Sequence, residues 1–509
     1  MLFYILVLAS LKSNSRGSTM IELPDFVTRG EVARLIPVVA ETRKEQRAVS
    51  AFLAVISAVP LFADKLFNPL GQNVSGSAKI DTFTEVVLRN GVSAENDRPD
   101  GLVQIKQRKK TWNALIEAKI GTAGLAKDQI ERYLKVARNN SIDALITISN
   151  EFATRPLLHP SSINKQLTKR VDLFHLSWTH ILTEAMLLHG SKEITDSEQF
   201  FLLRELIRFL SHESIGVNGY TSMPQSWSDA VTTFQAGGKL SRRNSDSDEI
   251  VFGWHQECRD LSLQMSQYLS RRITVWVPKS KKSNVDEWVE NDIQTLCDKG
   301  VLEARLQIPD TASDMYINAD LRSRTFRVSM EVKAPTDKQK STSRINWLLR
   351  QLKDIDTSDI FVRVKWSSRA ADTDILLASL VEDPKNDLIM GSKVLPRAFE
   401  VIMSKSSGGK FKGRKTFIVD LEMLCPDFYE RVGQHLKAWR PNPPKPNKSL
   451  LNDEIKTNPE QDRSIGNDHS ELLEVPSFLQ RLPENSNKNS LDEHKINRTK
   501  RISRYTARL

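Results

Sequence analysis

The sequence predicts an α/β fold that starts with a mixed central sheet covered by helices on both faces. A helical extension and a second α+β domain are expected to follow. Two observations support this prediction. Helical periodicity alternates with short β-branched runs over the first 190 residues. The chain has 509 residues, too many for one ordinary hydrophobic core, and its 39% hydrophobic and 27% charged residues suit a folded protein.

The first domain is predicted from periodicity, element by element. Residues 30–67 show apolar positions at helical spacing, and a further helix is expected around 82–89. Two strands, 101–107 and 112–119, flank a basic turn and are expected to form a hairpin. A helix at 128–138, strands at 144–149 and 171–178, and a helix at 180–188 complete the pattern. Helices that alternate with strands in this way cover both faces of a sheet.

The second half of the chain is also predicted to mix helices and strands. Asp196 and Gln199 form a capping box before an apolar helix at 200–210. The polar loop at 241–249 is expected to separate the helical extension from the second domain. Strands are predicted there at 273–277, 301–308, 315–317, 325–332 and 360–364, with an amphipathic helix at 344–352.

Composition divides the chain into five predicted segments. These are an N-terminal leader (1–29), a first domain with N-terminal helices (30–190), a helical extension (191–254), a second domain of unknown role (255–440) and a disordered basic tail (441–509). The leader begins with eleven apolar residues, too few to span a bilayer, which takes about 20. Met20 starts a run typical of a protein start, so residues 1–19 are either a leader or an untranslated artefact.

Charge and cysteine content narrow the classes of partner. Lys and Arg number 73 against 63 acidic residues, and the resulting charge of +10 favours polyanions such as nucleic acid. A surplus that serves only solubility is the alternative. The three cysteines have no CxxC or Cys/His spacing, so neither a disulfide framework nor a zinc site is expected. We expect a cytoplasmic protein with no membrane partner.

The stretch RPDGLVQIKQRKKTWNALIEAKIG carries the predicted chemistry. Asp100 lies at the start of one predicted strand, and Glu117 and Lys119 lie at the end of the next. Side chains alternate across a strand, so Glu117 and Lys119 share a face while Ala118 points away. A hairpin would therefore bring two carboxylates and a lysine together at its open end.

Two carboxylates and a backbone carbonyl, that of Ala118, form an incomplete oxygen shell that suits Mg²⁺. Water and a substrate phosphate would take the remaining positions. We expect Mg²⁺ as the cofactor, with Mn²⁺ able to substitute for it. The alternative is that PDG is a simple turn and EAK a charged strand end.

This pattern resembles the PD-(D/E)xK nuclease superfamily, which includes restriction endonucleases and RecB-like repair nucleases. Residues 80–180 carry the resemblance. Glu85 corresponds to an additional acidic residue at the metal site of many members, on the expected upstream helix. Gln129 and Tyr133 match the QxxxY element of RecB-like members, where it supports the site and contacts the nucleic-acid backbone.

The resemblance implies a metal-dependent nuclease, foremost a DNA endonuclease, in bacterial defence or stress response. Asp100, Glu117 and Lys119 would be catalytic, and Gln129 and Tyr133 would bind substrate. Glu85, Asp100, Glu117 and the Ala118 carbonyl would hold the metal. The alternative is a non-catalytic module that keeps the fold and binds nucleic acid or protein. DNA or RNA as the substrate, and a homodimer, stay open at this point.

Weaker patterns favour simpler interpretations. Asp320, Glu331 and Lys333 repeat the order of an acid followed by ExK, but a charged hairpin explains them better than a second nuclease-like core. His175 lies in a predicted core strand and is expected to be a hydrogen-bonded core histidine. The absence of GxGxxG and GxxxxGK[ST] patterns gives ATP hydrolysis no support.

Overall fold

The computed structural model describes residues 23–441, apart from short gaps. The gaps are 37–39, 41, 75–77, 90–97, 122–123, 154–162, 165, 243–244, 279–284, 368–370 and 386–393. Residues 1–22 of the expected leader and 442–509 of the expected tail lie outside the described residues, so both expectations stay predictions.

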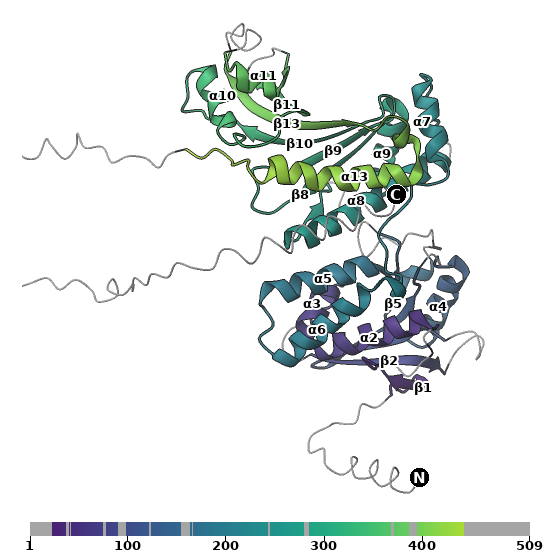
Figure 1. The fold of residues 1–509 in the computed structure, drawn as a ribbon. Coiled ribbons are helices and arrows are strands. Elements are labelled where there is room, and N and C mark those ends of the chain that lie inside the picture. The colour runs from purple at the N-terminus through teal and green to yellow at the C-terminus, as the bar shows by residue number, and fades with distance from the viewer. Residues whose placement is uncertain are drawn as a thin grey trace, which may run out of the picture. The chain divides into compact units, whose positions relative to one another are not determined.

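The described chain builds two separate sheets, and the predicted α/β class is confirmed (Figure 1). The first sheet has six strands in sequence order, β1-β2-β3-β4-β5-β6. Its first four strands pair antiparallel and the last three pair parallel, so the sheet is mixed as expected. The strands are β1 (Val27–Val32), β2 (Lys79–Leu88), β3 (Gly101–Gln107), β4 (Lys110–Ala118), β5 (Ala144–Ser149) and β6 (Asp172–Ser177).

Strand β2 replaces the helix that the sequence predicted at 82–89, and that prediction was wrong. The segment IDTFTEVVL is rich in Thr, Val and Phe, which favour a pleated surface, and β2 pairs with β3 over six residues. Its pairing with β1, a strand that the sequence did not predict, shifts register near Glu85. Glu85 has φ 55°, so it forms a bulge in the strand.

Helices cover both faces of the first sheet, and each face has its own hydrophobic core. On one face, apolar residues of β3 to β6 pack against α2, α3, α5 and α6. On the other face, residues such as Leu102, Leu115 and Leu145 pack against α4. The helices are α2 (Lys44–Ala58), α3 (Pro60–Phe67), α4 (Lys127–Asn139), α5 (Trp178–Ser191) and α6 (Ser197–Leu210).

Helices α2 and α3 form the apolar stretch that the sequence analysis placed in a helical region. Pro60 begins α3, and the two helices bend by 109° at the break before it. No single described helix is long and apolar enough to cross a membrane, although this bent pair passes the same test of length and composition. In this structure most apolar side chains of both helices pack in the core of the first sheet, and Leu61 of α3 is an exposed exception.

Gly101 allows α2 to lie close to the start of β3, and we expect an Ala substitution there to destabilise the fold. A Cβ at Gly101 would lie 2.6 Å from Leu53 Cδ1 and 3.2 Å from the Phe83 carbonyl oxygen. Overpacking of this kind costs about 1–3 kcal/mol. Urea unfolding of Gly101→Ala should show this loss, whereas Gly190→Ala in α5, where a Cβ meets nothing within 4 Å, should not. Equal stability of the two variants would contradict the close approach.

The second sheet has seven strands in the order β12-β11-β13-β10-β9-β8-β7, and all its neighbouring strands pair antiparallel. The strands are β7 (Thr274–Val275), β8 (Val301–Gln307), β9 (Met315–Asp320), β10 (Thr325–Lys333), β11 (Ile360–Trp366), β12 (Thr373–Leu376) and β13 (Pro396–Ser406). The helices whose residues pack against it are α7 (Trp227–Gln235), α8 (Ser245–Leu269), α9 (Val285–Lys299), α10 (Ser341–Leu349), α11 (Leu377–Glu382) and α13 (Arg414–Phe428).

The charged segment that repeats the ExK order belongs to this second sheet. Asp320 ends β9, and Glu331 and Lys333 lie on β10, its antiparallel neighbour. The register pairs Thr325 with Asp320 and Ser329 with Tyr316, so the two strands form an antiparallel hairpin. The expected charged hairpin is therefore confirmed.

The chain passes from the first hydrophobic core to the second between residues 215 and 223. Ile215 packs in the core of the first sheet, and Met223 packs in the core of the second. Helix α8 begins at Ser245, so the second half of the predicted loop at 241–249 is helical. Its sequence, SDSDE, suits the acidic first turn of a helix as well as it suits a polar loop.

Candidate active site

Strands β3 and β4 form the predicted hairpin and bring the three catalytic candidates together at its open end. Gly101 pairs with Ile116 in the register, so Asp100 lies beside the end of β4. Asp100 Oδ2 accepts a hydrogen bond of 2.8 Å from the Ala118 backbone N–H. Glu117 is on β4, and Lys119 follows it with its N–H bonded to the Ile148 carbonyl. The sheet therefore fixes all three backbones.

Glu117 and Lys119 share one face of β4, as the alternation predicted, and their side chains are in contact. Lys119 Nζ lies 2.9 Å from Glu117 Oε1 and 3.1 Å from the Ala118 carbonyl oxygen. The Glu117 side chain is 2% exposed, whereas that of Lys119 is 20% exposed. Ala118 points to the opposite face and packs in the core with α2. The lysine thus lies between a buried carboxylate and solvent.

Helix α4 braces this arrangement with Gln129 and Tyr133, which lie one turn apart. The Gln129 amide donates to Glu117 Oε1 at 2.7 Å. The Tyr133 hydroxyl donates to the Arg98 carbonyl oxygen at 3.1 Å, in the segment before Asp100. Tyr133 is 2% exposed. In this structure the two side chains hold the site itself, while contact with substrate stays a prediction.

Glu45, on the first turn of α2, is a site residue that the sequence analysis did not find. Its Oε2 lies 3.3 Å from Lys119 Nζ. No motif marks this acid, because α2 is distant in sequence and only the packing of α2 on the sheet brings it here. Glu85, which the sequence placed on a helix, lies instead on β2 and pairs with Arg98 at 2.9 Å.

Trp178 is a second contributor that the sequence analysis did not assign to the site. Its indole N–H donates to the Lys119 carbonyl oxygen at 2.9 Å. The ring is fully buried and packs edge-on against Phe52 of α2. Trp178 begins α5, immediately after β6, so it anchors the backbone of Lys119 from the neighbouring part of the sheet.

The electrostatics of the site follow from burial and from two neighbouring acids. Burial raises the pKa of Asp100 to about 6, although the Ala118 N–H and Lys119 act in the opposite direction. Burial, and then the charge of Asp100, raise the pKa of Glu117 to about 8. Burial alone would lower the pKa of Lys119, but the charge of Glu117 raises it above its ordinary value. Asp100 thus disfavours the charged form of Glu117, whereas Lys119 favours the charged form of both acids.

The donor chemistry of the site fits a hard divalent cation. Asp100 and Glu117 are buried oxygen donors whose mutual repulsion a cation would relieve, and the Ala118 carbonyl adds a third oxygen. Within the described residues, no group of three or more Asp, Glu, His or Cys side chains is arranged to hold a metal by itself. These three oxygens would therefore need water and substrate to complete a shell.

His175 has the structural role that was expected for it. It is 2% exposed, and its ring nitrogens lie 2.9 Å from Thr147 Oγ1 and 2.9 Å from the Glu151 carbonyl oxygen. Thr147 pairs with both Glu117 and His175 in the sheet register, so the histidine lies two strands from the catalytic candidates. It is a hydrogen-bonded core histidine, as predicted.

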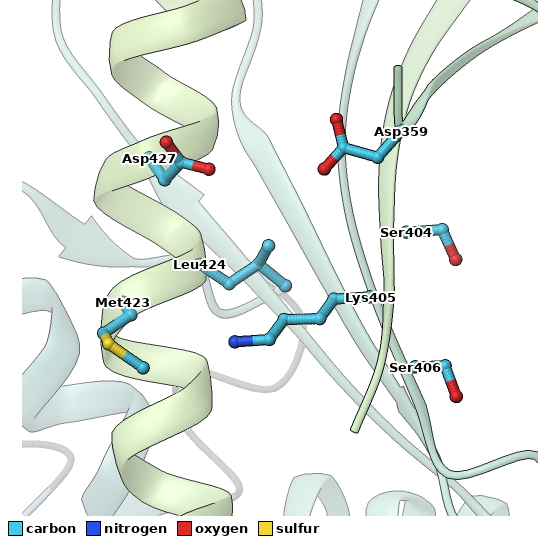
Figure 2. Close-up of a pocket in the computed structure, with 7 residues that line it drawn as sticks. All are labelled: Asp359, Ser404, Lys405, Ser406, Met423, Leu424 and Asp427. Carbon is cyan, nitrogen blue, oxygen red and sulfur yellow. The ribbon is translucent and has the colours of Figure 1, made fainter. Parts of the chain in front are cut away.

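A groove of about 490 Å³ in the second half of the chain does not compete with this site (Figure 2). Lys405 of β13 points toward α13 there, and its Nζ pairs with Asp420 at 3.0 Å. Asp359 pairs with Arg431 at 2.6 Å. The groove is lined by Asp359, Ser404, Lys405, Ser406, Met423, Leu424 and Asp427. Its charged groups are engaged in ion pairs, and it brings no nucleophile and base together.

The chain matches no protein-family model, and no curated protein matches it at a significant level. The geometry of Asp100, Glu117 and Lys119 is therefore the main guide to function.

Proposed function

We propose that the protein is a metal-dependent nuclease of the PD-(D/E)xK type that hydrolyses phosphodiester bonds, with DNA as the foremost substrate. The observation that carries the proposal is the meeting of Asp100, Glu117 and Lys119 at the open end of the β3–β4 hairpin. The bond from Gln129 to Glu117 supports it, because it connects the QxxxY element to the same carboxylate.

Each side chain has a role that follows from its contacts. Asp100 and Glu117, with the Ala118 carbonyl, would hold Mg²⁺, or Mn²⁺ in its place. The cation, when bound, would neutralise charge on the phosphate and lower the pKa of the attacking water. Lys119 lies beside Glu117 with 20% of its side chain exposed, so its ammonium group can orient that water or stabilise the charged transition state.

The test is cleavage of plasmid DNA, linear DNA and single-stranded RNA by the purified full chain. We expect cleavage of DNA with Mg²⁺ or Mn²⁺, none with a chelator, and none by Asp100→Ala. Calorimetric titration with Mn²⁺ gives a second readout, in which Asp100→Ala should lose binding. DNA binding without any metal-dependent cleavage would contradict the proposal and favour a non-catalytic nucleic-acid module.

We expect different results when Glu45 and Glu85, the two additional acids near the site, are each changed to Gln. Glu45 contacts Lys119 directly, whereas Glu85 is engaged with Arg98. We expect Glu45→Gln to raise the Mg²⁺ concentration for half-maximal cleavage by roughly tenfold, a size typical of residues that support a metal site. Glu85→Gln should change it less. A larger effect of Glu85→Gln would indicate that Glu85, as the sequence predicted, supports the metal site and that Glu45 does not.

A further inference from the structure

Among the described residues, one face of the second sheet does not pack in its hydrophobic core. On β10, for example, Phe326, Val328, Met330 and Val332 pack in the core, and the residues between them point the other way. The same alternation runs through β8, β9 and β11. Strand β13 differs, because Ala398 and Ile402 on this face are buried as well. We call the surface formed by the residues that point away from the core the open face.

One row of the open face crosses the strands and has exposed aromatic rings at both ends. The strand register pairs Arg305 with Tyr316 and Tyr316 with Ser329. It then pairs Ser329 with Ile402 and Ile402 with Phe361. Trp276 joins the row through its N–H bond to the Arg305 carbonyl. The row is Trp276, Arg305, Tyr316, Ser329, Ile402 and Phe361.

Three rings of this row are exposed, whereas Ser329 and Ile402 in the middle of the row are buried. Trp276 and Phe361 are each 37% exposed, and Tyr316 is 41% exposed. The Arg305 guanidinium carbon lies 4.6 Å from the Trp276 ring centroid and 5.1 Å from that of Tyr316. Trp, Tyr and Arg are the residues that contribute most energy to protein interfaces, so this composition favours a protein partner.

The charges beside the row balance, which argues against a polyanion. The open face carries five basic and five acidic residues: Arg305, Arg327, Lys333, Arg363 and Lys365, with Glu303, Asp320, Glu331, Asp374 and Glu400. Several form ion pairs within the face, such as Lys365 with Glu331 at 2.7 Å. The acids would repel phosphates, so nucleic acid gains no net attraction here. A neutral face on a chain of net charge +10 is a place where two copies can meet without net repulsion.

We propose that the open face is the contact surface of a homodimer, in which two copies pack sheet against sheet. Seven strands about 4.8 Å apart and about six residues long give a face on the order of 700 Å². A standard interface buries about 800 Å² on each partner, so the dimer would have to use nearly the whole face. Sheets that pack face to face do so through such rows of side chains.

A two-fold axis along the aromatic row gives this dimer complementary charges. Arg327 and Glu331 lie two residues to either side of Ser329 on the same face of β10. Rotation about the row places Arg327 of one copy over Glu331 of the second copy, and the reverse pair forms as well. The same rotation brings each Tyr316 onto its counterpart. Opposite charges thus meet while the rings bury their exposed faces.

The charge pair offers a test by mixing two variants. Arg327→Glu should weaken the dimer, because it places acid over acid, and Glu331→Arg should do the same with bases. An equimolar mixture of the two variants should associate again, because both cross-copy pairs then have opposite signs. Sedimentation equilibrium of the full chain measures each case, with circular dichroism as the check on folding.

The aromatic rings offer a second test with a matched control. We expect wild-type protein to be dimeric at micromolar concentration, and Tyr316→Ala to weaken association by at least tenfold. Tyr268→Ala, on α8 and 54% exposed, should leave it unchanged. A monomeric wild type would overturn the proposal, as would a dimer that neither Tyr316→Ala nor the charge variants weaken.

Discussion

Lys119→Ala is expected to reduce metal-dependent cleavage by roughly 10³-fold or more, a size typical of removing a charged group that stabilises a transition state. The ammonium group of Lys119 lies 2.9 Å from Glu117 and 3.3 Å from Glu45, so it is the cation that both acids contact. Without it, water at the site loses its positive neighbour. Single-turnover cleavage of labelled DNA at saturating Mg²⁺ measures the effect.

Two further variants separate this loss from a loss of folding. Glu117 is buried, so removing its partner should also cost about 1–3 kcal/mol of stability. Lys119→Gln keeps a hydrogen-bond donor without the charge, and we expect it to fold more stably yet cleave as poorly. Lys135→Ala, exposed on α4, is the matched control and should cleave normally. Wild-type cleavage by Lys119→Ala would remove the lysine from the mechanism.

Stability is expected to fall as the pH rises from about 4 to about 7, because of a buried acid in α8. Burial, and then the charge of Glu422, raise the pKa of Asp260 from 3.8 to about 7. The folded state therefore binds this proton more tightly than the unfolded state. The stabilisation by protonated Asp260 is complete below the pKa of the unfolded state, 3.8, and is lost as the pH rises to the pKa of the folded state, about 7. A difference of about three in pKa corresponds to a loss on the order of 4 kcal/mol in the free energy of unfolding.

The surroundings of Asp260 explain why its charge is costly. Asp260 Oδ2 accepts from the Tyr220 N–H at 2.6 Å and from Gln264 at 3.0 Å, but Oδ1 has no hydrogen-bond partner among the described residues. Both carboxylate oxygens of Glu257, one turn earlier, also lack such a partner there. Burial raises the pKa of Glu257 well above its ordinary value, and Glu422 and Asp260 add to the effect.

Denaturant unfolding between pH 4 and pH 8 measures this dependence. Asp260→Asn keeps an acceptor for the Tyr220 N–H but cannot ionise, so its stability should decline less steeply than that of the wild type. Asp248→Asn, exposed on the same helix, should follow the wild-type curve. Parallel curves for wild type and Asp260→Asn would show that another group controls the dependence.

Features of the site that depend on local pattern could be predicted from the sequence. Alternation placed Glu117 and Lys119 on one face of a strand, and the basic turn between two apolar runs gave the hairpin that brings Asp100 beside them. One-turn spacing placed Gln129 and Tyr133 on one side of α4. Each of these relations spans few residues, so backbone geometry alone fixes it.

Contributions from distant segments of the chain depend on how helices pack on the sheet and could not be predicted. Glu45 and Trp178 reach Lys119 because α2 and α5 pack on the same face of the sheet, and no local pattern marks either residue. The segment around Glu85 alternates too weakly to exclude a helix, and its pairing with β1 and β3 made it a strand. The open face likewise depends on the order of seven strands, which side-chain periodicity does not specify.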